Sequence, residues 1–397
     1  MNIINEIFAE YRQKKEELEV SVADMKAEIQ NYLERILIYG AGSSGIAFLY
    51  YLRKVGIEPR FFVDSDRSKA GTDCEGLKII APEQILSQAG EDALVIVCIN
   101  TDGKRYCKSF AEALRAGGHH GVYEKLRGCG CKNIIDYTYF RRCHALFMDE
   151  KYNAPSCSDV YLMEEYEREI AKVYDMMEDE LSREVFEKIT KFRLLDDSLE
   201  VPTMSQEKQY FEYGFYEKRQ DEVFVDCGAF NGISLKTFLK ENNNMFDDYY
   251  GMEPDPDNYV KLEEYTGTLP EEVWGKIHIT SKAAWKDDKG IRLYALRGPG
   301  SFAADIGNIR AETTTIDAML EGKRASYIKM NIEGSEKEAL QGAEQTIRRY
   351  KPRLAIAGYH RTDDFFRVPL MMKSYREDYK IYLRSYMNHI SFVYYGV

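Results

Sequence analysis

Apolar residues follow a helical rhythm at the start of the chain and a strand rhythm in two later regions. Between residues 2 and 34 they recur at steps of three and four, which predicts one amphipathic helix. The stripe consists of Ile4, Phe8, Tyr11, Leu18, Val22, Met25, Ile29 and Tyr32, and Lys15 interrupts it. This pattern fits a helix docked on its own domain and a short coiled coil equally well, so a homodimer through this helix stays open.

Short apolar runs that alternate with helical stretches begin at residue 35. Strands are predicted at 35–39, 60–63 and 94–98, and helices at 46–54 and around 106–115. Alternation of strand and helix predicts a parallel sheet, so we assign residues 35–131 to a Rossmann-type domain. Residues 132–220 are mostly helical and charged, and they form a predicted helical connector.

A second alternating region covers residues 221–397. Its predicted strands lie at 222–225, 249–252, 277–280, 327–330, 354–357, 379–384 and 391–395. The fold class is therefore α/β, with two Rossmann-like three-layer domains, the second built on a seven-stranded sheet. An N-terminal helix over residues 1–34 and the helical connector complete the predicted organisation.

Composition and charge argue against nucleic-acid and membrane partners. The chain has 397 residues and a formal net charge of −12 with no Lys/Arg stripe, which argues against a nucleic-acid partner. No apolar run is long enough to cross a bilayer, and the first residues lack an apolar signal core. We therefore expect a cytoplasmic protein without a membrane partner.

The cysteines offer one candidate metal site. Among the eight cysteines, Cys129, Cys131, Cys143 and Cys157 lie near one another in the sequence, with His144 beside them. The C-x-x-C pair of most zinc sites is missing here, so we expect ordinary thiols and no bound metal.

A glycine-rich turn follows the first predicted strand. Gly40, Gly42 and Gly45 form a G-x-G-x-x-G pattern that opens a helix, and Asp64 ends the next strand. This is the dinucleotide fingerprint in its required setting: the helix start can hold a diphosphate and the acid a ribose. NAD or a nucleotide sugar is the expected ligand, and a ligand-free structural domain is the alternative.

A second glycine-rich turn, over residues 225–232, carries an acid at the end of its strand. Gly228 and Gly232 allow the backbone to approach a ligand closely. Asp226 would repel a phosphate but suits a cationic ligand, and S-adenosylmethionine carries both an ammonium and a sulfonium group. We add Ala229 and Asn231 of the same turn to the candidate donor site; a turn without a ligand is the alternative reading.

The ends of the next two strands supply further donor-site candidates. Glu253, followed by Pro254, lies where an acid accepts hydrogen bonds from both ribose hydroxyls. A helix-capping acid is the alternative, and it suits Asp255 better than Glu253. Small residues Ala283 and Ala284 would line an adenine slot.

Polar residues alternate along the fourth strand of this region. Lys329, Asn331 and Glu333 share one face by the two-residue period, and buried groups of this kind need partners. His360 follows the fifth strand and is the best titratable candidate for a general base. Glu333 and Lys329 are the other catalytic candidates for the base, and Asn331 is the candidate that orients the methyl donor or acceptor. The alternatives are a structural ion pair for Lys329 and Glu333, and a structural role for the histidine.

These blocks together resemble the FkbM family of methyltransferases. The resemblance runs from about residue 181 to residue 397 and rests on residues 182–186, 209–211, 225–232, 253–256, 328–336, 342–343, 354–356 and 359–360. It implies a class I methyltransferase fold that binds S-adenosylmethionine at the strand ends and methylates hydroxyl oxygens, commonly of sugars or secondary metabolites. Asn331 replaces the aspartate of the family pattern, which puts an acid–base role at that position in doubt.

The sequence therefore predicts an S-adenosylmethionine-dependent O-methyltransferase of a small molecule or glycan. A nucleotide- or nucleotide-sugar-binding domain would precede it. The competing hypotheses are an NAD-dependent oxidoreductase and a catalytically silent nucleotide-binding scaffold.

Overall fold

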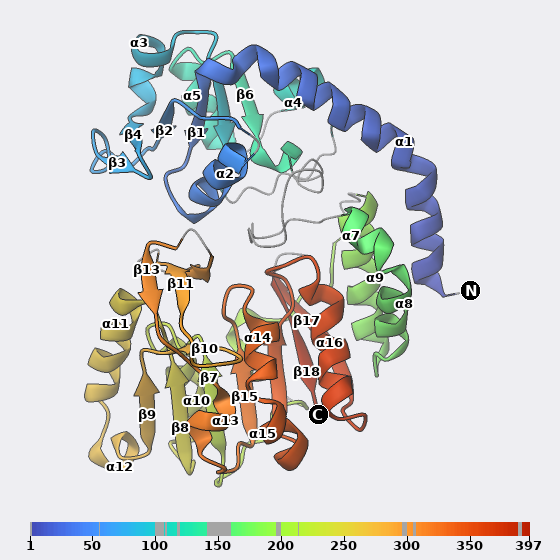
Figure 1. Ribbon diagram of the computed structural model, residues 1–397, viewed down its shortest axis with the longest axis vertical. Helices are drawn as coiled ribbons and strands as arrows, with labels where there is room; N and C mark the ends of the chain where they lie inside the picture. The colour runs from blue at the N-terminus through green and yellow to red at the C-terminus, as the bar shows by residue number, and fades with distance from the viewer. Residues whose placement is uncertain are drawn as a thin grey trace. The chain divides into compact units, whose positions relative to one another are not determined.

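The chain divides into two compact units, each described here by itself (Figure 1). The computed structural model describes residues 2–54, 56–99, 107, 109–116, 120–140, 160–195, 200–212, 214–295, 300–304, 307–387 and 391–397. Unit 1 comprises Met1–Glu167 and Thr190–Leu199, and unit 2 comprises Arg168–Ile189 and Glu200–Val397. No helix within these described ranges is both long and apolar enough to cross a membrane.

The predicted N-terminal helix is α1 (Ile3–Ile29), continued by the 3-10 helix η1 (Gln30–Arg35). It begins at Asn2, whose Oδ1 accepts the N–H of Ile4 at 2.9 Å. Its apolar stripe is buried within the chain at Ile4, Ile7, Phe8, Tyr11, Val22, Met25 and Ile29. Further along, Asp24 Oδ2 accepts the N–H of Phe110 at 2.6 Å. The chain itself thus covers this stripe, as expected of a docked helix.

Unit 1 is built on a six-stranded sheet with the order β3-β4-β2-β1-β5-β6. All neighbouring strands are parallel except β3 and β4. The strands are β1 (Ile36–Tyr39), β2 (Phe61–Val63), β3 (Asp73–Cys74), β4 (Leu77–Ile80), β5 (Leu94–Val97) and β6 (Asn133–Asp136). The helices are α2 (Ser43–Lys54), η2 (Pro82–Gln84), α3 (Ile85–Ala89), α4 (Phe110–Ala116), α5 (His120–Gly128), η3 (Tyr137–Phe140) and α7 (Val160–Glu165). Strand β6 extends this sheet beyond the expected boundary at residue 131, into the segment expected to be helical.

Unit 2 contains the expected seven-stranded sheet, in the order β17-β18-β16-β15-β7-β8-β9. Its strands are β7 (Val223–Cys227), β8 (Asp248–Met252), β9 (Ile277–Thr280), β15 (Tyr327–Met330), β16 (Arg353–Ala357), β17 (Ile381–Met387) and β18 (Ser391–Gly396). Strands β7, β8, β9, β15 and β16 are parallel, and β18 is antiparallel to both of its neighbours. Because the strand order reverses beside β7, the carboxyl end of β7 is where such a sheet binds ligands.

Short strands and helices complete unit 2. Two small sheets pair β10 (Ala283–Ala284) with β14 (Thr313–Thr314), and β11 (Ile291–Tyr294) with β12 (Phe302–Ala303) and β13 (Ile309–Ala311). The helices are α8 (Glu167–Asp175), η4 (Gln206–Lys208), α10 (Ile233–Glu241), α11 (Pro256–Gly267), α12 (Glu271–Trp274), α13 (Ile316–Leu320), α14 (Glu336–Gln341), α15 (Glu344–Tyr350) and α16 (Asp364–Tyr375). Helix α9 (Glu180–Leu195) contributes to both units.

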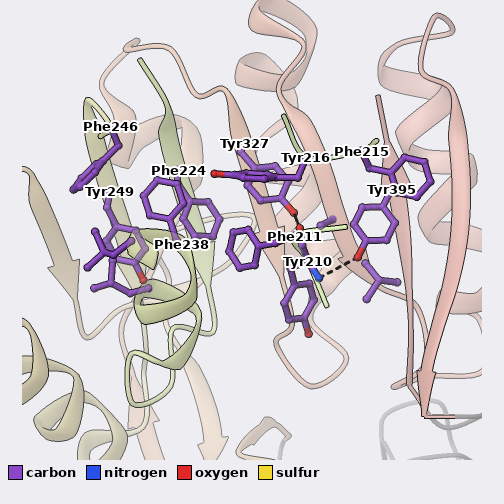
Figure 2. Close-up of a cluster of buried hydrophobic side chains, with 14 of the residues drawn as sticks. Tyr210, Phe211, Phe215, Tyr216, Phe224, Phe238, Phe246, Tyr249, Tyr327 and Tyr395 are labelled. Atoms are coloured by element: carbon purple, nitrogen blue, oxygen red, sulfur yellow. Dashed lines mark hydrogen bonds between the residues drawn. The ribbon is translucent and has the colours of Figure 1, made fainter. Parts of the chain in front are cut away.

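An aromatic core supports the centre of the unit 2 sheet (Figure 2). Phe224 of β7 stacks on Tyr327 of β15, with ring centroids 5.2 Å apart. Phe211 packs edge-on against Phe224 at 5.9 Å, and the N–H of its neighbour Tyr210 donates to Tyr395 Oη at 3.0 Å. This packing fixes the segment around Tyr210 against the sheet and brings it to the ligand-binding end.

Candidate functional site

A pocket of about 1070 Å³ opens where β7, β8 and β15 end. Eight residues singled out in the sequence line it: Gly228, Glu253, Pro254, Ala283, Ala284, Lys329, Asn331 and Glu333. The volume is slightly above the range of about 300–1,000 Å³ that is usual for small-molecule and cofactor sites. The structure therefore brings the predicted ribose, adenine and strand-four residues to one cavity at the reversal of strand order.

Gly228 is required by the close approach of two strand ends. Its φ of +79° lies in the left-handed region, and a Cβ there would lie 2.2 Å from the carbonyl oxygen of Asn331. The N–H groups of Gly228 and Ala229 both donate to the carbonyl of Met252, at 3.0 and 3.1 Å. The turn after β7 is thus tied to the ends of both β8 and β15.

Glu253 lines the pocket at the end of β8 and has a fixed orientation. Its Oε2 accepts the N–H of Phe230 at 2.9 Å, and its Oε1 accepts the N–H of Asp255 at 3.0 Å. Burial raises the pKa of Glu253 to about 7, although the two N–H groups oppose the shift. Each carboxylate oxygen accepts one backbone hydrogen bond and has a second lone pair for a ligand hydroxyl. Asp255 is the helix cap, since its Oδ1 accepts the N–H of Asp257 at 3.0 Å.

Asp226 lies beneath the pocket and not among the described residues that line it. Its side chain is fully buried and accepts hydrogen bonds from Ser234 Oγ and, at 2.8 Å, from Tyr249 Oη. Its Oδ1 accepts from Lys329 Nζ at 2.9 Å. The expected direct contact with a cationic ligand is therefore replaced by a contact with a protein cation.

Lys329 completes this buried ion pair. Its ammonium also donates to the carbonyls of Gly228 at 2.8 Å and Cys227 at 3.3 Å, and it lies 5.2 Å from the centre of the Tyr210 ring. Three acceptors use all three ammonium protons. The geometry gives Lys329 the role of a clamp on the Gly228 turn. This is a structural ion pair, but its partner is Asp226 and not the expected Glu333.

Asn331 and Glu333 bring polar groups to the pocket wall after β15. Asn331 Oδ1 accepts from Tyr359 Oη at 3.0 Å. Glu333 has a left-handed backbone, with φ of +53°, and its side chain is 27% exposed. Burial raises the pKa of Glu333, while the neighbouring His360 opposes the shift. Glu333 thus brings a partly exposed carboxylate to the pocket wall at this strand end.

His360 is buried behind Glu333, and it is not among the described pocket-lining residues. Its Nε2 lies 3.5 Å from Glu333 Oε2, and its Nδ1 lies 2.9 Å from Glu336 Oε1. Burial alone would lower the pKa of His360, but the carboxylates of Glu336 and Glu333 outweigh it and raise the pKa to about 9. An imidazole that is already protonated at neutral pH and has no pocket contact is a poor general base.

Three other turn residues predicted for the donor site are also absent from the described lining. Ala229 is buried, Asn231 is exposed, and Gly232 is the N-cap of helix α10 with φ of +84°. A Cβ on Gly232 would lie 2.6 Å from the ring of Tyr265, so this glycine serves packing between helices.

The pocket also contains residues that the sequence reasoning missed. Tyr210, Phe230, Met252, Asn258, Ser301 and Ser335 line it. Tyr210 and Phe230 have positive φ values of 73° and 52°. Strained backbone at a pocket often accompanies a ligand site, but it leaves little trace in the sequence of a non-glycine residue.

The glycine turn of unit 1 has the geometry of its fingerprint. A Cβ on Gly45 would lie 1.9 Å from the carbonyl oxygen of Gly40, which has φ of +105°. Asp64 accepts the N–H of Ala41 at 3.1 Å and pairs with Lys69 at 3.0 Å, while Gly42 faces open space. In the cysteine cluster, Cys129 is half-buried and Cys131 is buried. Residues 143, 144 and 157 lie outside the described residues.

Comparisons with known proteins bear on both units. Residues 226–389 match the family model described as "Methyltransferase FkbM domain". Among solved structures, a methyltransferase FkbM from Methylobacillus flagellatus KT has 20% sequence identity and a TM-score of 0.68, and the match covers 100% of this chain and 99% of that one. At this identity the match shows the fold alone. No curated protein matches.

Two weaker structural matches share only part of the chain. A putative rRNA methylase from Clostridium thermocellum matches over 45% of this chain and 87% of its own, with 8% identity and a TM-score of 0.30. A UDP-D-quinovosamine 4-dehydrogenase from Vibrio fischeri matches over 26% of this chain and 76% of its own, with 24% identity and a TM-score of 0.19.

Proposed function

We propose that this chain, a methyltransferase whose residues 226–389 form an FkbM domain, transfers a methyl group from S-adenosylmethionine to a hydroxyl oxygen of a small molecule or glycan. The methyltransferase domain itself supports S-adenosylmethionine as the donor. The acceptor class rests on the family resemblance and on the Glu333 carboxylate, which lines the pocket.

The observation that carries the proposal is the position of Glu253. Its carboxylate lies in the pocket at the end of β8, oriented by two backbone N–H groups and with acceptor capacity left over. A ribose places two neighbouring hydroxyl donors within reach of such a carboxylate. Ala283 and Ala284 leave room beside it for the flat adenine ring.

The methyl group would then be presented near the end of β15. The acceptor oxygen attacks the methyl carbon, the carbon–sulfur bond breaks, and the electron pair leaves with a neutral thioether. Because alignment supplies most of the rate in such a displacement, the clamp of Lys329 on the Gly228 turn matters through position. We assign the hydroxyl proton to the Glu333 carboxylate, which lines the pocket, and Asn331 to orientation of the acceptor.

His360 takes a positioning role in this scheme. Its ring lies between the carboxylates of Glu333 and Glu336 and contacts the pocket only through Glu333. Substitution of His360 would therefore act through the placement of Glu333.

A nucleotide or nucleotide sugar is the proposed ligand of unit 1. The turn from Gly40 to Gly45 opens helix α2 after a parallel strand, and Gly42 leaves open space in front of the backbone. An NAD-dependent oxidoreductase and a catalytically silent scaffold are the competing proposals for the function of the chain. A cytoplasmic location and a homodimer through α1 are separate proposals, compatible with each of these functions.

Calorimetry with four ligands separates these proposals. S-adenosylmethionine and S-adenosylhomocysteine should bind at one site per chain, and Glu253→Ala should abolish that binding while leaving nucleotide binding unchanged. Asp64→Ala should abolish binding of NAD or a UDP-sugar while leaving adenosyl-ligand binding unchanged. Absence of adenosyl-ligand binding to the wild-type chain refutes the methyl-transfer proposal.

A further inference from the structure

Behind the pocket wall lies a buried group of three side chains that are not among the described residues lining the pocket. Glu336, at the start of α14, His360, after β16, and Asp364, at the start of α16, place one carboxylate or imidazole atom each within 4.8 Å of one another. All three are buried, with exposed fractions of 0%, 3% and 0%. They meet because β15 and β16 are parallel neighbours, whose carboxyl ends lie at the same edge of the sheet.

Polar atoms of this group lack hydrogen-bond partners among the described residues. Both ring nitrogens of His360 and Oδ1 of Asp364 are buried without one. His360 Nδ1 lies 2.9 Å from Glu336 Oε1, yet the two atoms do not meet in hydrogen-bond geometry. Burying a polar atom without a hydrogen-bond partner costs free energy of folding. Several such atoms in one place therefore indicate a ligand that would satisfy them.

The two carboxylates are held in place by other groups. Glu336 accepts the N–H of Ile332 at 2.9 Å through Oε1 and that of Gly334 at 3.0 Å through Oε2. Asp364 Oδ2 accepts the N–H of Arg361 at 2.9 Å. Outer hydrogen bonds of this kind orient metal ligands and leave a lone pair for the ion.

The described cation that faces Glu336 is His360, whose proton a bound metal ion would displace. Lys337 pairs closely with Asp363 and reaches Asp364 Oδ1 only at 3.6 Å. Arg367 also pairs with Asp363, at 3.2 Å. Besides His360, no described cation lies within ion-pair distance of Glu336. A divalent ion would neutralise the two buried carboxylates.

We infer that Glu336, His360 and Asp364 bind one divalent first-row transition-metal ion such as Mn²⁺. One imidazole and two carboxylates, without a thiolate, suit Mn²⁺, Fe²⁺ or Zn²⁺. At metal–ligand distances of about 2.1 Å, adjacent ligands lie about 3 Å apart, which matches the separation between His360 Nδ1 and Glu336 Oε1. The expectation of no bound metal concerned the cysteine cluster, whereas these three ligands come from separate elements and share no sequence motif.

The site is independent of the methyl-transfer proposal, so it is tested without donor or acceptor. The full chain is treated with a chelator, exchanged into metal-free buffer and titrated with Mn²⁺, with free Mn²⁺ followed by electron paramagnetic resonance. One Mn²⁺ should bind per chain, and bound metal should raise the Tm of the chain. Asp364→Asn and His360→Gln should each weaken binding at least tenfold.

His278→Ala is the matched control, because this half-exposed histidine also pairs with a carboxylate, at 2.9 Å from Asp248 Oδ1. Its Mn²⁺ stoichiometry and affinity should equal those of the wild-type chain. Failure of the folded wild-type chain to take up Mn²⁺ overturns the inference, and so does binding that survives in either folded ligand variant. S-adenosylhomocysteine binding by the metal-free chain, measured in parallel, reports separately on the proposed function.

Discussion

Removal of the Asp226 carboxylate is expected to destabilise unit 2 strongly, because it leaves a buried ammonium group without its counter-charge. The side chains of Lys329 and Asp226 are 3% and 0% exposed, and their charged atoms lie 2.9 Å apart. In Asp226→Ala, Lys329 keeps only the carbonyls of Gly228 and Cys227, and the hydroxyls of Ser234 and Tyr249 lose their common acceptor.

The magnitude follows from this burial. Breaking a buried ion pair from one side costs about 3–5 kcal/mol. Since two carbonyls still accept from the ammonium, we expect a loss of about 3 kcal/mol in the free energy of unfolding of unit 2. For a unit of about 200 residues, this corresponds to a decrease in Tm of about 6–12 °C.

Urea unfolding followed by far-UV circular dichroism measures the loss, and hydrogen exchange of peptides from β7 and β15 assigns the transition to unit 2. Lys329→Met removes the ammonium group that Asp226→Ala leaves without a counter-charge. The double variant Asp226→Ala/Lys329→Met should therefore lose at least about 1 kcal/mol less unfolding free energy than the two single variants lose together. Asp221→Ala is the control: this half-exposed carboxylate pairs with Arg219 and Arg324 at the surface, and its loss should leave the unfolding of unit 2 close to that of the wild-type chain. A loss below about 1 kcal/mol for Asp226→Ala, with additive effects in the double variant, would refute the clamp.

The remaining predictions concern the pocket. Because burial raises the pKa of Glu253 to about 7 and ribose hydroxyls donate to its ionised form, calorimetry should show S-adenosylhomocysteine affinity rising from pH 6 to pH 8, and a flat profile contradicts this role. Glu253→Gln should bind this ligand at least about tenfold more weakly and remove the pH dependence. Gly228→Ala should abolish donor binding and lower Tm, because its Cβ would lie 2.2 Å from the Asn331 carbonyl; unchanged binding shows that the turn is not at the donor. Once an acceptor is known, Glu333→Gln should lower kcat about 10²–10⁴-fold with donor affinity retained, and an unchanged kcat removes Glu333 as the proton acceptor.

The central strands of unit 2 could be predicted because they are mostly apolar and end in a polar or glycine turn. Residues 222–225 and 327–330 are of this kind, and they became β7 and β15. The strands missed in unit 1 are very short or interrupted by polar residues: β3 has two residues, Lys78 breaks the run of β4, and β6 has only two apolar residues, between Asn133 and Asp136. Such segments acquire strand geometry from their neighbours in the sheet.

From the sequence, the pocket could be placed at the ends of the strands, but the contacts of its side chains could not be predicted. Gly228 and Glu253 could be placed because position after a strand decides their location. The sequence could not show that the oxygens of Asp226 are taken up by Ser234, Tyr249 and Lys329, since that depends on side-chain direction and packing.

The cluster of Glu336, His360 and Asp364 was hidden for a related reason. Its members come from two helix starts and a loop, and no motif spacing connects them. Only the parallel pairing of β15 and β16 brings their segments to one edge of the sheet.

A crystal structure of the chain with S-adenosylhomocysteine tests the central claim most directly. The account predicts the ribose hydroxyls within hydrogen-bond distance of the Glu253 carboxylate, the adenine beside Ala283 and Ala284, and the sulfur directed toward Asn331 and Glu333. A ligand bound elsewhere, or one whose ribose makes no contact with Glu253, would contradict it.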